Sequence, residues 1–395
     1  MHGDIKLATL SDTDDTDAVF TELAANSSFN TSSDWTLGSG WSISGGQALK
    51  TTNDNNSISQ LVSGLDTSRT YVFEVDVATG SSSIYFYFNG SYSIAISGTG
   101  KQSVTFKPNS TSIEIGVTGI TGNGTVLNSI SFSLAEEDRS VNGNGLQVFG
   151  TVQKTPVATG ADLVAYSGFS AGNNIQQPYN SDMDIGASDD VCVITWAKLK
   201  TGNSYIFDRT DDANTGARYF AYRRGGSDDK LVFFGLASST AFTDDFVADW
   251  HQYTLLRRGG MIEIWVDGKL DATIADTSDK TNTSAKLTIG NNYTTGANNA
   301  ASDLALFRFS VTAPSPEQIK KIYEDEKVLF QENAKATLYG TSDAVTALAY
   351  DDSTELLHVG TSDGRSVFQG LRRVDNTTDA VGAAISASNG LVAED

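Results

Sequence analysis

The stretch WHQYTLLRRGGMIEIWVDGKLDATI, residues 250–274, reads as strands separated by tight turns. A pair of adjacent glycines ends the first run of β-forming residues, and such a pair is a hairpin signal. In the second run, Ile262, Ile264 and Val266 alternate with other residues, which places them on one face of a strand. An Asp-Gly pair then predicts another turn. This alternation is typical of an antiparallel sheet with one buried face.

The whole chain has the composition of a protein built from short strands. Its 395 residues suffice for two or three domains of about 100–200 residues each. Hydrophobic residues make up 39% of the chain, which is enough for packed cores. Gly is frequent, with 37 residues, and Pro is rare, with 5. Together with many Ser, Thr, Asn and Asp residues, this predicts strands joined by polar turns.

The formal net charge of −21 argues against a nucleic-acid partner, because phosphate binding needs a basic face. No run of about 18 apolar residues occurs, so we expect no membrane insertion. The first residues lack a basic region followed by an apolar stretch, so we expect no signal peptide. The single cysteine, Cys192, excludes an intrachain disulfide. It predicts a small buried side chain, with a nucleophile as the remote alternative.

Four segments differ in their sequence pattern. Residues 1–25 are acidic and lack periodicity, and they predict an N-terminal arm with a short helix that begins near Asp17. Residues 26–138 carry alternating runs such as TYVFEVDVA and SIYFYFNG, which predict a β-sandwich. Residues 139–335 carry eight further strand-like runs and end in a helix. Residues 336–395 form a short tail that is too small for a core of its own.

One long helix is predicted, over residues 315–332. Ser315 is a suitable N-cap and Pro316 fits the first turn. One side carries an apolar stripe, formed by Ile319, Ile322, Tyr323, Leu329 and Phe330. The predicted fold class is therefore all-β, with two antiparallel jelly-roll β-sandwiches in tandem, one helix after the second, and a small C-terminal β module.

The opening hairpin resembles the signature of the laminin-G-like, concanavalin A-like jelly-roll family. In that family a Trp-His pair opens a strand and a VDG turn follows a strand of alternating apolar residues. Here these are Trp250-His251 and the residues from Ile262 to Gly268. The segments LTIGNNY and SDLALFRFSVTAPSPEQIKKIYEDE resemble the later strands and the terminal helix, so the resemblance covers about residues 141–326. It implies a lectin-like fold and leaves the function open, because the family contains lectins, adhesion modules and spacers.

Two further resemblances concern the rest of the chain. Residues 30–135 resemble galactose-binding-like, carbohydrate-binding jelly rolls through DWTLGSGWSISGGQAL and LNSISFSL. The segment VTALAYDDSTELLHVGTSDGRSVF is similar to one β-propeller blade, which cannot close a propeller alone. The combination resembles bacteriophage structural proteins, especially marine-phage tail or fibre proteins. That resemblance implies a virion protein that is made in the host cytoplasm and released by lysis, without a signal peptide or disulfides.

Catalytic groupings are scarce in the sequence. Its three histidines give no Ser-His-Asp grouping and no zinc-type spacing. Jelly-roll glycosidases need two carboxylates about 5–10 Å apart. The nearest acidic stretch, EVDVAT, has Thr79 where the third carboxylate of one such pattern would stand. Glu74 and Asp76 are therefore interpreted as the solvent face of a strand, and we expect no enzyme activity.

Sugar binding is the better functional candidate, because exposed aromatic rings and Asn, Asp or Gln side chains suit sugars. In SIYFYFNG the phenylalanines face the core, which leaves Tyr85 and Tyr87 on the other face, next to Asn89. Trp35 and Trp41 lie in the opening segment, and one of them is a candidate to line the same cleft. The alternative is that both tryptophans are core and the tyrosines only cover a sheet.

No cofactor is expected, although calcium is a candidate because jelly rolls of this kind commonly bind it. The ion needs about six to eight oxygen ligands. Asp303 ends the segment NNYTTGANNAASD, which has the composition of a ligand loop, so Asp303 is the candidate metal ligand. The alternative is an aspartate that only forms a turn.

The leading functional hypothesis is a phage virion component of the tail or a fibre that contacts host-surface polysaccharide. One alternative is a head fibre, capsid decoration protein or assembly adaptor without glycan binding, and another is a polysaccharide hydrolase. Residues 336–395 carry strand-like apolar residues that so short a segment cannot bury, so we expect them to pack against other copies in a homotrimer. The acidic arm is expected to dock to other virion proteins.

Overall fold

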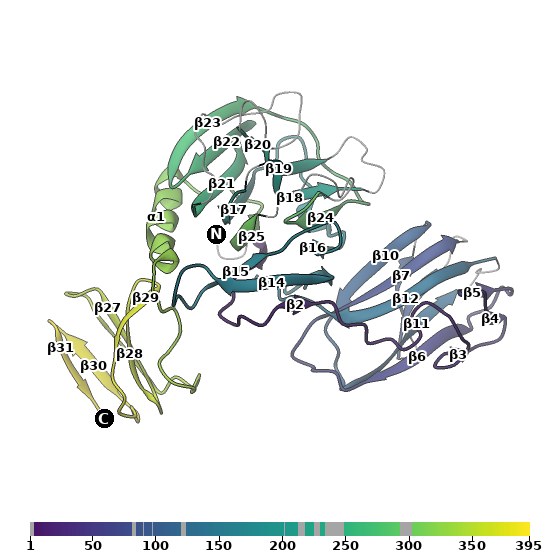
Figure 1. Ribbon diagram of the computed structural model, residues 1–395, viewed down its shortest axis with the longest axis horizontal. Helices are drawn as coiled ribbons and strands as arrows, with labels where there is room; N and C mark the ends of the chain where they lie inside the picture. Colours follow the sequence, from purple (N-terminus) through teal and green to yellow (C-terminus); the bar gives the residue numbers. More distant parts are fainter. Residues whose placement is uncertain are drawn as a thin grey trace.

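The computed structural model describes residues 4–80, 84–89, 91–96, 98–119, 124–200, 202–211, 218–224, 230–233, 249–292 and 302–395. Within them the protein is almost entirely β-structure, with a single α-helix. A first sandwich, a second sandwich that carries the helix, and a small C-terminal module make up the molecule (Figure 1). The predicted all-β fold class is confirmed.

The first sandwich packs two five-stranded antiparallel sheets against each other, in the orders β10-β7-β12-β5-β4 and β3-β6-β11-β8-β9. Its strands are β3 (Thr36–Leu37), β4 (Trp41–Ser44), β5 (Gln47–Lys50), β6 (Ser57–Ser63), β7 (Tyr71–Thr79), β8 (Ile84–Phe88), β9 (Ser91–Ile96), β10 (Gly100–Phe106), β11 (Ser112–Gly119) and β12 (Val126–Leu134). Alternate residues of each strand face the core. The ring of Phe73 on β7 lies 5.0 Å from that of Phe86 on β8, centroid to centroid, which joins the two sheets.

The second sandwich pairs a nine-stranded sheet with a six-stranded sheet. The larger sheet has the order β2-β14-β15-β25-β17-β21-β22-β23, with β1 also paired to β25, and the smaller has the order β13-β16-β24-β18-β19-β20. Its strands are β1 (Ile5–Thr9), β2 (Ala18–Val19), β13 (Gln147–Phe149), β14 (Thr151–Pro156), β15 (Val164–Ser167), β16 (Asn174–Gln177), β17 (Val191–Lys198), β18 (Ser204–Thr210), β19 (Tyr219–Arg224), β20 (Lys230–Phe233), β21 (His251–Arg258), β22 (Met261–Val266), β23 (Lys269–Ala275), β24 (Lys286–Ile289) and β25 (Asp303–Ser310).

The hairpin from which the fold was predicted forms strands β21, β22 and β23. Both glycines of its first turn, Gly259 and Gly260, have positive φ, as do Asp267 and Gly268 in the second turn. Two consecutive residues with positive φ match the right-handed twist of the flanking strands. Ile262 and its alternating neighbours on β22 face the core, as predicted.

The N-terminal residues do not form a separate arm, and no helix begins near Asp17. Strand β1 pairs antiparallel with β25, and β2 pairs with β14. Leu7 and Leu10 are buried in the core of the second sandwich. The sequence pattern was too short to show this, because each partner strand lies more than a hundred residues away in the chain.

The helix α1 (Pro316–Glu326) is shorter than predicted and continues as the 3₁₀ helix η2 (Lys327–Phe330). Ser315 caps α1 in a capping box with Gln318. The helix packs on the outer face of the larger sheet of the second sandwich, where Ile319 is buried. The tighter 3₁₀ turn brings Phe330 onto Trp196, with 4.1 Å between ring centroids.

The C-terminal module is a four-stranded antiparallel meander covered on one face by a two-stranded hairpin. Its strands are β26 (Ala347–Asp351), β27 (Leu356–Thr361), β28 (Gly364–Gln369), β29 (Arg372–Asn376), β30 (Ile385–Ser388) and β31 (Leu391–Glu394). Val381 is buried between the meander and the hairpin, close to Gly360. On the other side, Leu348 and Tyr350 are 60% and 54% exposed.

Candidate functional site

Trp35 and Trp41 lie in the core of the first sandwich, so the expectation that one of them lines a binding cleft is corrected. Each is 6% exposed. The indole N–H of Trp35 donates to the backbone oxygen of Asn26 at 3.0 Å, and that of Trp41 donates to the backbone oxygen of Asn56 at 2.9 Å. Lys50 lies over the Trp41 ring. Both indoles therefore hold loops onto the sandwich.

Tyr85 and Tyr87 are half-buried on the outer face of the first sandwich. The Tyr87 hydroxyl donates to the Glu114 carboxylate at 3.4 Å. The side-chain oxygen of Asn89 accepts from the backbone N–H of Glu114 at 2.8 Å, and Asn89 has a φ of 46°. Asn89 thus serves the turn after β8. The tyrosines stay a predicted sugar site.

Asp303 pairs with Lys200, whose ammonium lies 2.8 Å from the carboxylate. Residues 293–301 of the predicted ligand loop lie outside the described residues. Among the residues that are described, no group of three or more His, Cys, Asp or Glu side chains gathers to hold a metal. Calcium binding at Asp303 stays a prediction.

Glu74 does not lie on a solvent-exposed face, in contrast to the prediction from its strand. Its side chain is buried where β7 meets the second sandwich. One carboxylate oxygen accepts from Lys101 at 2.8 Å and the other accepts from Gln147 of β13 at 3.1 Å. The outer face of the β10-β7-β12 sheet is therefore an interface between the sandwiches, and Figure 1 shows this sheet beside β16 and β24.

A cleft with two connected parts lies at this interface. The inner pocket, of about 320 Å³, lies between Glu74 of the first sandwich and Thr288 of the second. The outer groove, of about 750 Å³, runs between β10 and the loop around Tyr179. Lys101 and Lys286 line both parts. Pockets of about 300–1,000 Å³ are typical of small-ligand sites.

The floor of the inner pocket is a row of polar side chains across the smaller sheet of the second sandwich. Gln176 on β16 is paired with Thr288 on β24, and both line the pocket. Asp208 on β18, which is paired with Thr288, is buried and does not line the pocket. All three point away from the core, because the residues next to them along each strand face inward. Asn174 and Asn292 complete the lining on this side.

An aromatic cluster continues the same face beyond the pocket. Tyr205 and Tyr222 are stacked with 4.7 Å between ring centroids and 12° between ring planes. Phe220 lies beside them, 5.5 Å from Tyr222, and the guanidinium of Arg218 lies 4.4 Å above its ring. Asn292 connects cluster and pocket, since its side-chain N–H donates to the Tyr205 hydroxyl at 3.0 Å.

The charged side chains of Arg218 and Asp208 on this face form an ion pair. The Arg218 guanidinium binds both oxygens of Asp208, at 2.8 and 2.9 Å. Burial lowers the pKa of Arg218, but the hydrogen bonds and charge of Asp208 outweigh it and hold this pKa above its usual value. Burial likewise raises the pKa of Tyr205, which keeps its hydroxyl neutral. The face therefore offers rings and neutral hydrogen-bonding groups.

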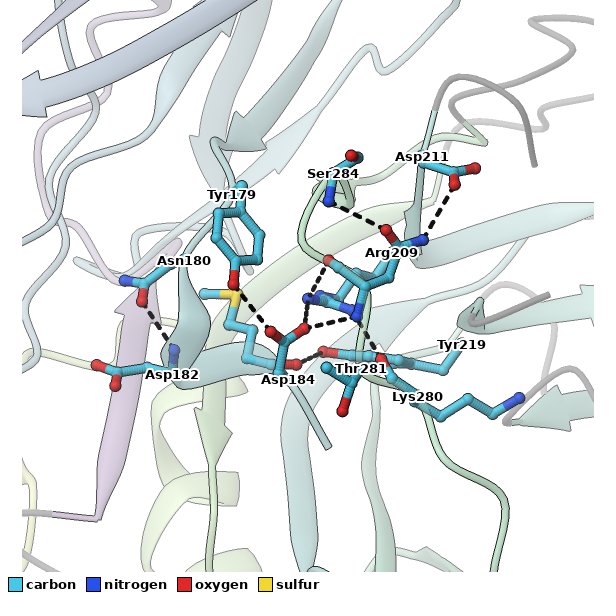
Figure 2. Close-up of polar contacts among 12 residues, drawn as sticks. Tyr179, Asn180, Asp182, Asp184, Arg209, Asp211, Tyr219, Lys280, Thr281 and Ser284 are labelled. Atoms are coloured by element: carbon cyan, nitrogen blue, oxygen red, sulfur yellow. Dashed lines mark hydrogen bonds and ion pairs between the residues drawn. The ribbon is translucent and has the colours of Figure 1, made fainter. Parts of the chain in front are cut away.

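The wall of the outer groove is fixed by a buried arginine. Figure 2 shows Arg209 and Tyr179 pointing toward the Asp184 carboxylate. The Tyr179 hydroxyl donates to Asp184 at 2.9 Å, and the Arg209 guanidinium binds the other oxygen. Burial and the Asp184 carboxylate raise the pKa of Tyr179. The network holds the ring of Tyr179, which is 39% exposed, at the groove.

This face was not predicted from the sequence. The local signal was present, since SYIFDRT and RYFAY both carry aromatic residues at alternate positions. The sequence does not show the strand register that places Tyr205 opposite Tyr222. A bulge near Phe207 interrupts the alternation along β18, so this register cannot be read from the pattern of residues.

Comparison with protein families agrees with this architecture. Residues 169–320 match the model of the Concanavalin A-like lectin/glucanases superfamily. The chain contains a concanavalin A-like jelly-roll domain. That domain holds the whole aromatic cluster and most of the pocket floor. No curated protein matches the chain.

Solved structures with a similar arrangement include binding domains. The binding domain of Paraclostridial Mosquitocidal Protein 1 is 15% identical with a TM-score of 0.36, and the match covers 58% of this chain and 62% of that chain. The receptor binding domain of botulinum neurotoxin D is 14% identical with a TM-score of 0.35, and the match covers 61% of this chain and 61% of that chain. This chain thus spans about three fifths of the length of those structures.

Domain 4 of an extracellular arabinanase from Geobacillus stearothermophilus, solved in complex with arabinotriose, is 16% identical with a TM-score of 0.37. That match covers 47% of this chain and 92% of that domain. Likenesses of this size carry no inference about a ligand. Within the described residues, no helix has the length and apolar character needed to cross a membrane.

Proposed function

We propose that this protein is a glycan-binding protein and that the outer face of the β13-β16-β24-β18-β19-β20 sheet is its binding surface. The observation that carries the proposal is the cluster of Tyr205, Phe220 and Tyr222, which lies directly beside the polar side chains of Arg218 and Asn292. Aromatic rings suit the flat C–H faces of sugars, and the polar side chains suit their hydroxyls.

The arrangement suits a neutral saccharide chain. The aromatic rings of the cluster would contact the faces of some sugar units. The cleft toward the first sandwich would hold the neighbouring sugar units of the same chain. The Arg218 guanidinium is held in place by both oxygens of the buried Asp208, so little ordering of this side chain is needed on binding.

A glycan array tests this function. The full chain, labelled and applied to printed neutral and acidic oligosaccharides, is expected to bind a restricted set of glycans. Phe220→Ala removes a ring from the cluster and is expected to lose those signals, whereas the chain with Leu371→Ala, an exposed residue of the C-terminal module, keeps them. An array without signal for the full chain would refute glycan binding.

The finer proposal is that the glycan belongs to a bacterial surface and that the protein is a component of a phage tail or fibre. Its support is the combination of jelly-roll domains with a single blade-like module, together with the exposed apolar residues of that module. A head fibre, decoration protein or adaptor without glycan binding is the alternative, and it predicts a silent array. A polysaccharide hydrolase predicts the release of reducing ends from the bound glycan, which we do not expect.

A further inference from the structure

We propose that the inner pocket between the two sandwiches binds one neutral, hydroxyl-rich ring, such as a single sugar residue, and that the first sandwich completes this site. The proposal deepens the proposed function, since the ring would be part of the same glycan. It adds a subsite that the concanavalin A-like domain cannot form alone, because Glu74 and Lys101 belong to the other sandwich.

Two buried oxygen atoms of residues that line the pocket lack a hydrogen-bond partner among the described residues. One is the side-chain oxygen of Asn174, a residue that is 6% exposed, and the other is the hydroxyl of Thr288, a residue that is 0% exposed. The amide nitrogen of Asn174 already donates to the backbone oxygen of Ala171 at 3.3 Å. Asn174 therefore offers an acceptor and Thr288 a hydroxyl that can donate or accept.

Such buried groups destabilise a fold unless something binds them. Both residues line the pocket, so a molecule inside it is in a position to supply the missing hydrogen bonds. A ring with adjacent hydroxyls provides both donors and acceptors, and an apolar ligand provides neither. The chemistry of the two oxygens thus selects a polyol.

The charged groups of the pocket favour a neutral ligand over an anion. Glu74 and Lys101 neutralise each other at 2.8 Å, and the ammonium of Lys101 also lies over the Phe149 ring. Lys286 directs its ammonium to the backbone oxygen of Lys101 at 3.4 Å. The charge of Lys101 is thus compensated by Glu74, and the net charge of the chain, −21, opposes an anion further.

Thr288→Val tests the pocket directly. The change keeps the shape of the side chain and removes the hydroxyl, so the free energy of unfolding should stay the same or rise slightly. Thr254→Val is the matched control, because Thr254 is equally buried and its hydroxyl also lacks a partner, but it lies on β21 away from the pocket. Lys101→Ala tests the contribution of the first sandwich.

The measurement is isothermal titration of the full chain and the three variants with the best neutral oligosaccharide from the array, and with the methyl glycosides of glucose, galactose, mannose and arabinose. Thr288→Val and Lys101→Ala are expected to weaken binding at least 10-fold, while Thr254→Val binds like the unchanged chain. Galacturonic acid is expected to bind no more tightly than methyl galactoside.

The outcomes separate this subsite from the proposed function. If the chain binds the oligosaccharide and Thr288→Val binds equally well, the pocket holds only water and the subsite is refuted while glycan binding stands. Tighter binding of galacturonic acid would refute the preference for a neutral ring. If neither the oligosaccharides nor the methyl glycosides bind, both proposals fail.

Discussion

His358 on β27 shows how burial sets the protonation state of a single residue in the C-terminal module. It is 4% exposed, and its Nδ1 atom has no hydrogen-bond partner among the described residues. Burial lowers the pKa of His358 below 6.5, and the positive charge of Arg365 lowers it further, whereas Asp351 and Glu394 act weakly in the other direction. The folded module therefore holds this imidazole neutral.

This lowered pKa predicts a loss of stability in mild acid. Above pH 6.5 the histidine is neutral in both states, so its contribution to folding is fully present. As the pH falls below 6.5, the unfolded chain takes up the proton first and the free energy of unfolding decreases. Urea unfolding of the module at pH 7.5 and 5.5 should show the decrease, and His358→Gln should reduce it. An unchanged pH dependence in that variant would contradict the assignment.

At the level of elements, the helix α1 and the 3₁₀ turn after it are held by an aromatic stack on the larger sheet. Trp196 of β17 is 2% exposed and stacks with Tyr323 and Phe330. Its indole N–H donates to the Glu326 carboxylate at 2.8 Å. One side chain thus joins the sheet to both helical turns.

Trp196→Ala should therefore destabilise the second sandwich strongly. Loss of a large buried aromatic side chain costs about 3–5 kcal/mol of unfolding free energy, and the buried Glu326 loses a donor as well. The control is Lys321→Ala on the same helix, whose side chain is 74% exposed and which should change stability by no more than about 0.5 kcal/mol. Denaturant unfolding measures both, and equal effects would show that the stack is not what holds the helix.

At this level the sequence predicted those features that depend on residues close together in the chain. The β21–β22 hairpin and the cap of α1 depend on residues next to one another, and both were predicted. Strand β1 was missed because its partner β25 lies far along the chain. The proposed binding face was missed because it depends on the strand register, which aligns Thr288 with Asp208. The tryptophans were ambiguous, since an aromatic residue suits a core and a sugar site equally well.

At the scale of the whole molecule, the edge strand of the C-terminal module exposes apolar side chains. Leu348 and Tyr350 project from the edge strand β26, and both are more than half exposed. An exposed apolar edge invites association with another chain. We propose a homotrimer in which copies of this edge cover one another.

Sedimentation tests the assembly. The full chain should sediment at about 126 kDa, three times its mass of 42.0 kDa. The double variant Leu348→Glu and Tyr350→Glu places charges on the apolar edge and should sediment as a monomer. A full chain that is already monomeric, or a double variant that stays associated, would contradict the proposal.

The central claim is that the outer face of the smaller sheet in the second sandwich binds a glycan. Its most direct test is the affinity of the full chain, Tyr222→Ala and Tyr350→Ala for the best oligosaccharide from the array, measured by isothermal titration. Both variants lose a tyrosine, but only Tyr222 belongs to the aromatic cluster. We expect Tyr222→Ala to weaken binding at least 10-fold, about 1.4 kcal/mol, and Tyr350→Ala to bind normally. Equal affinity of all three proteins would contradict it.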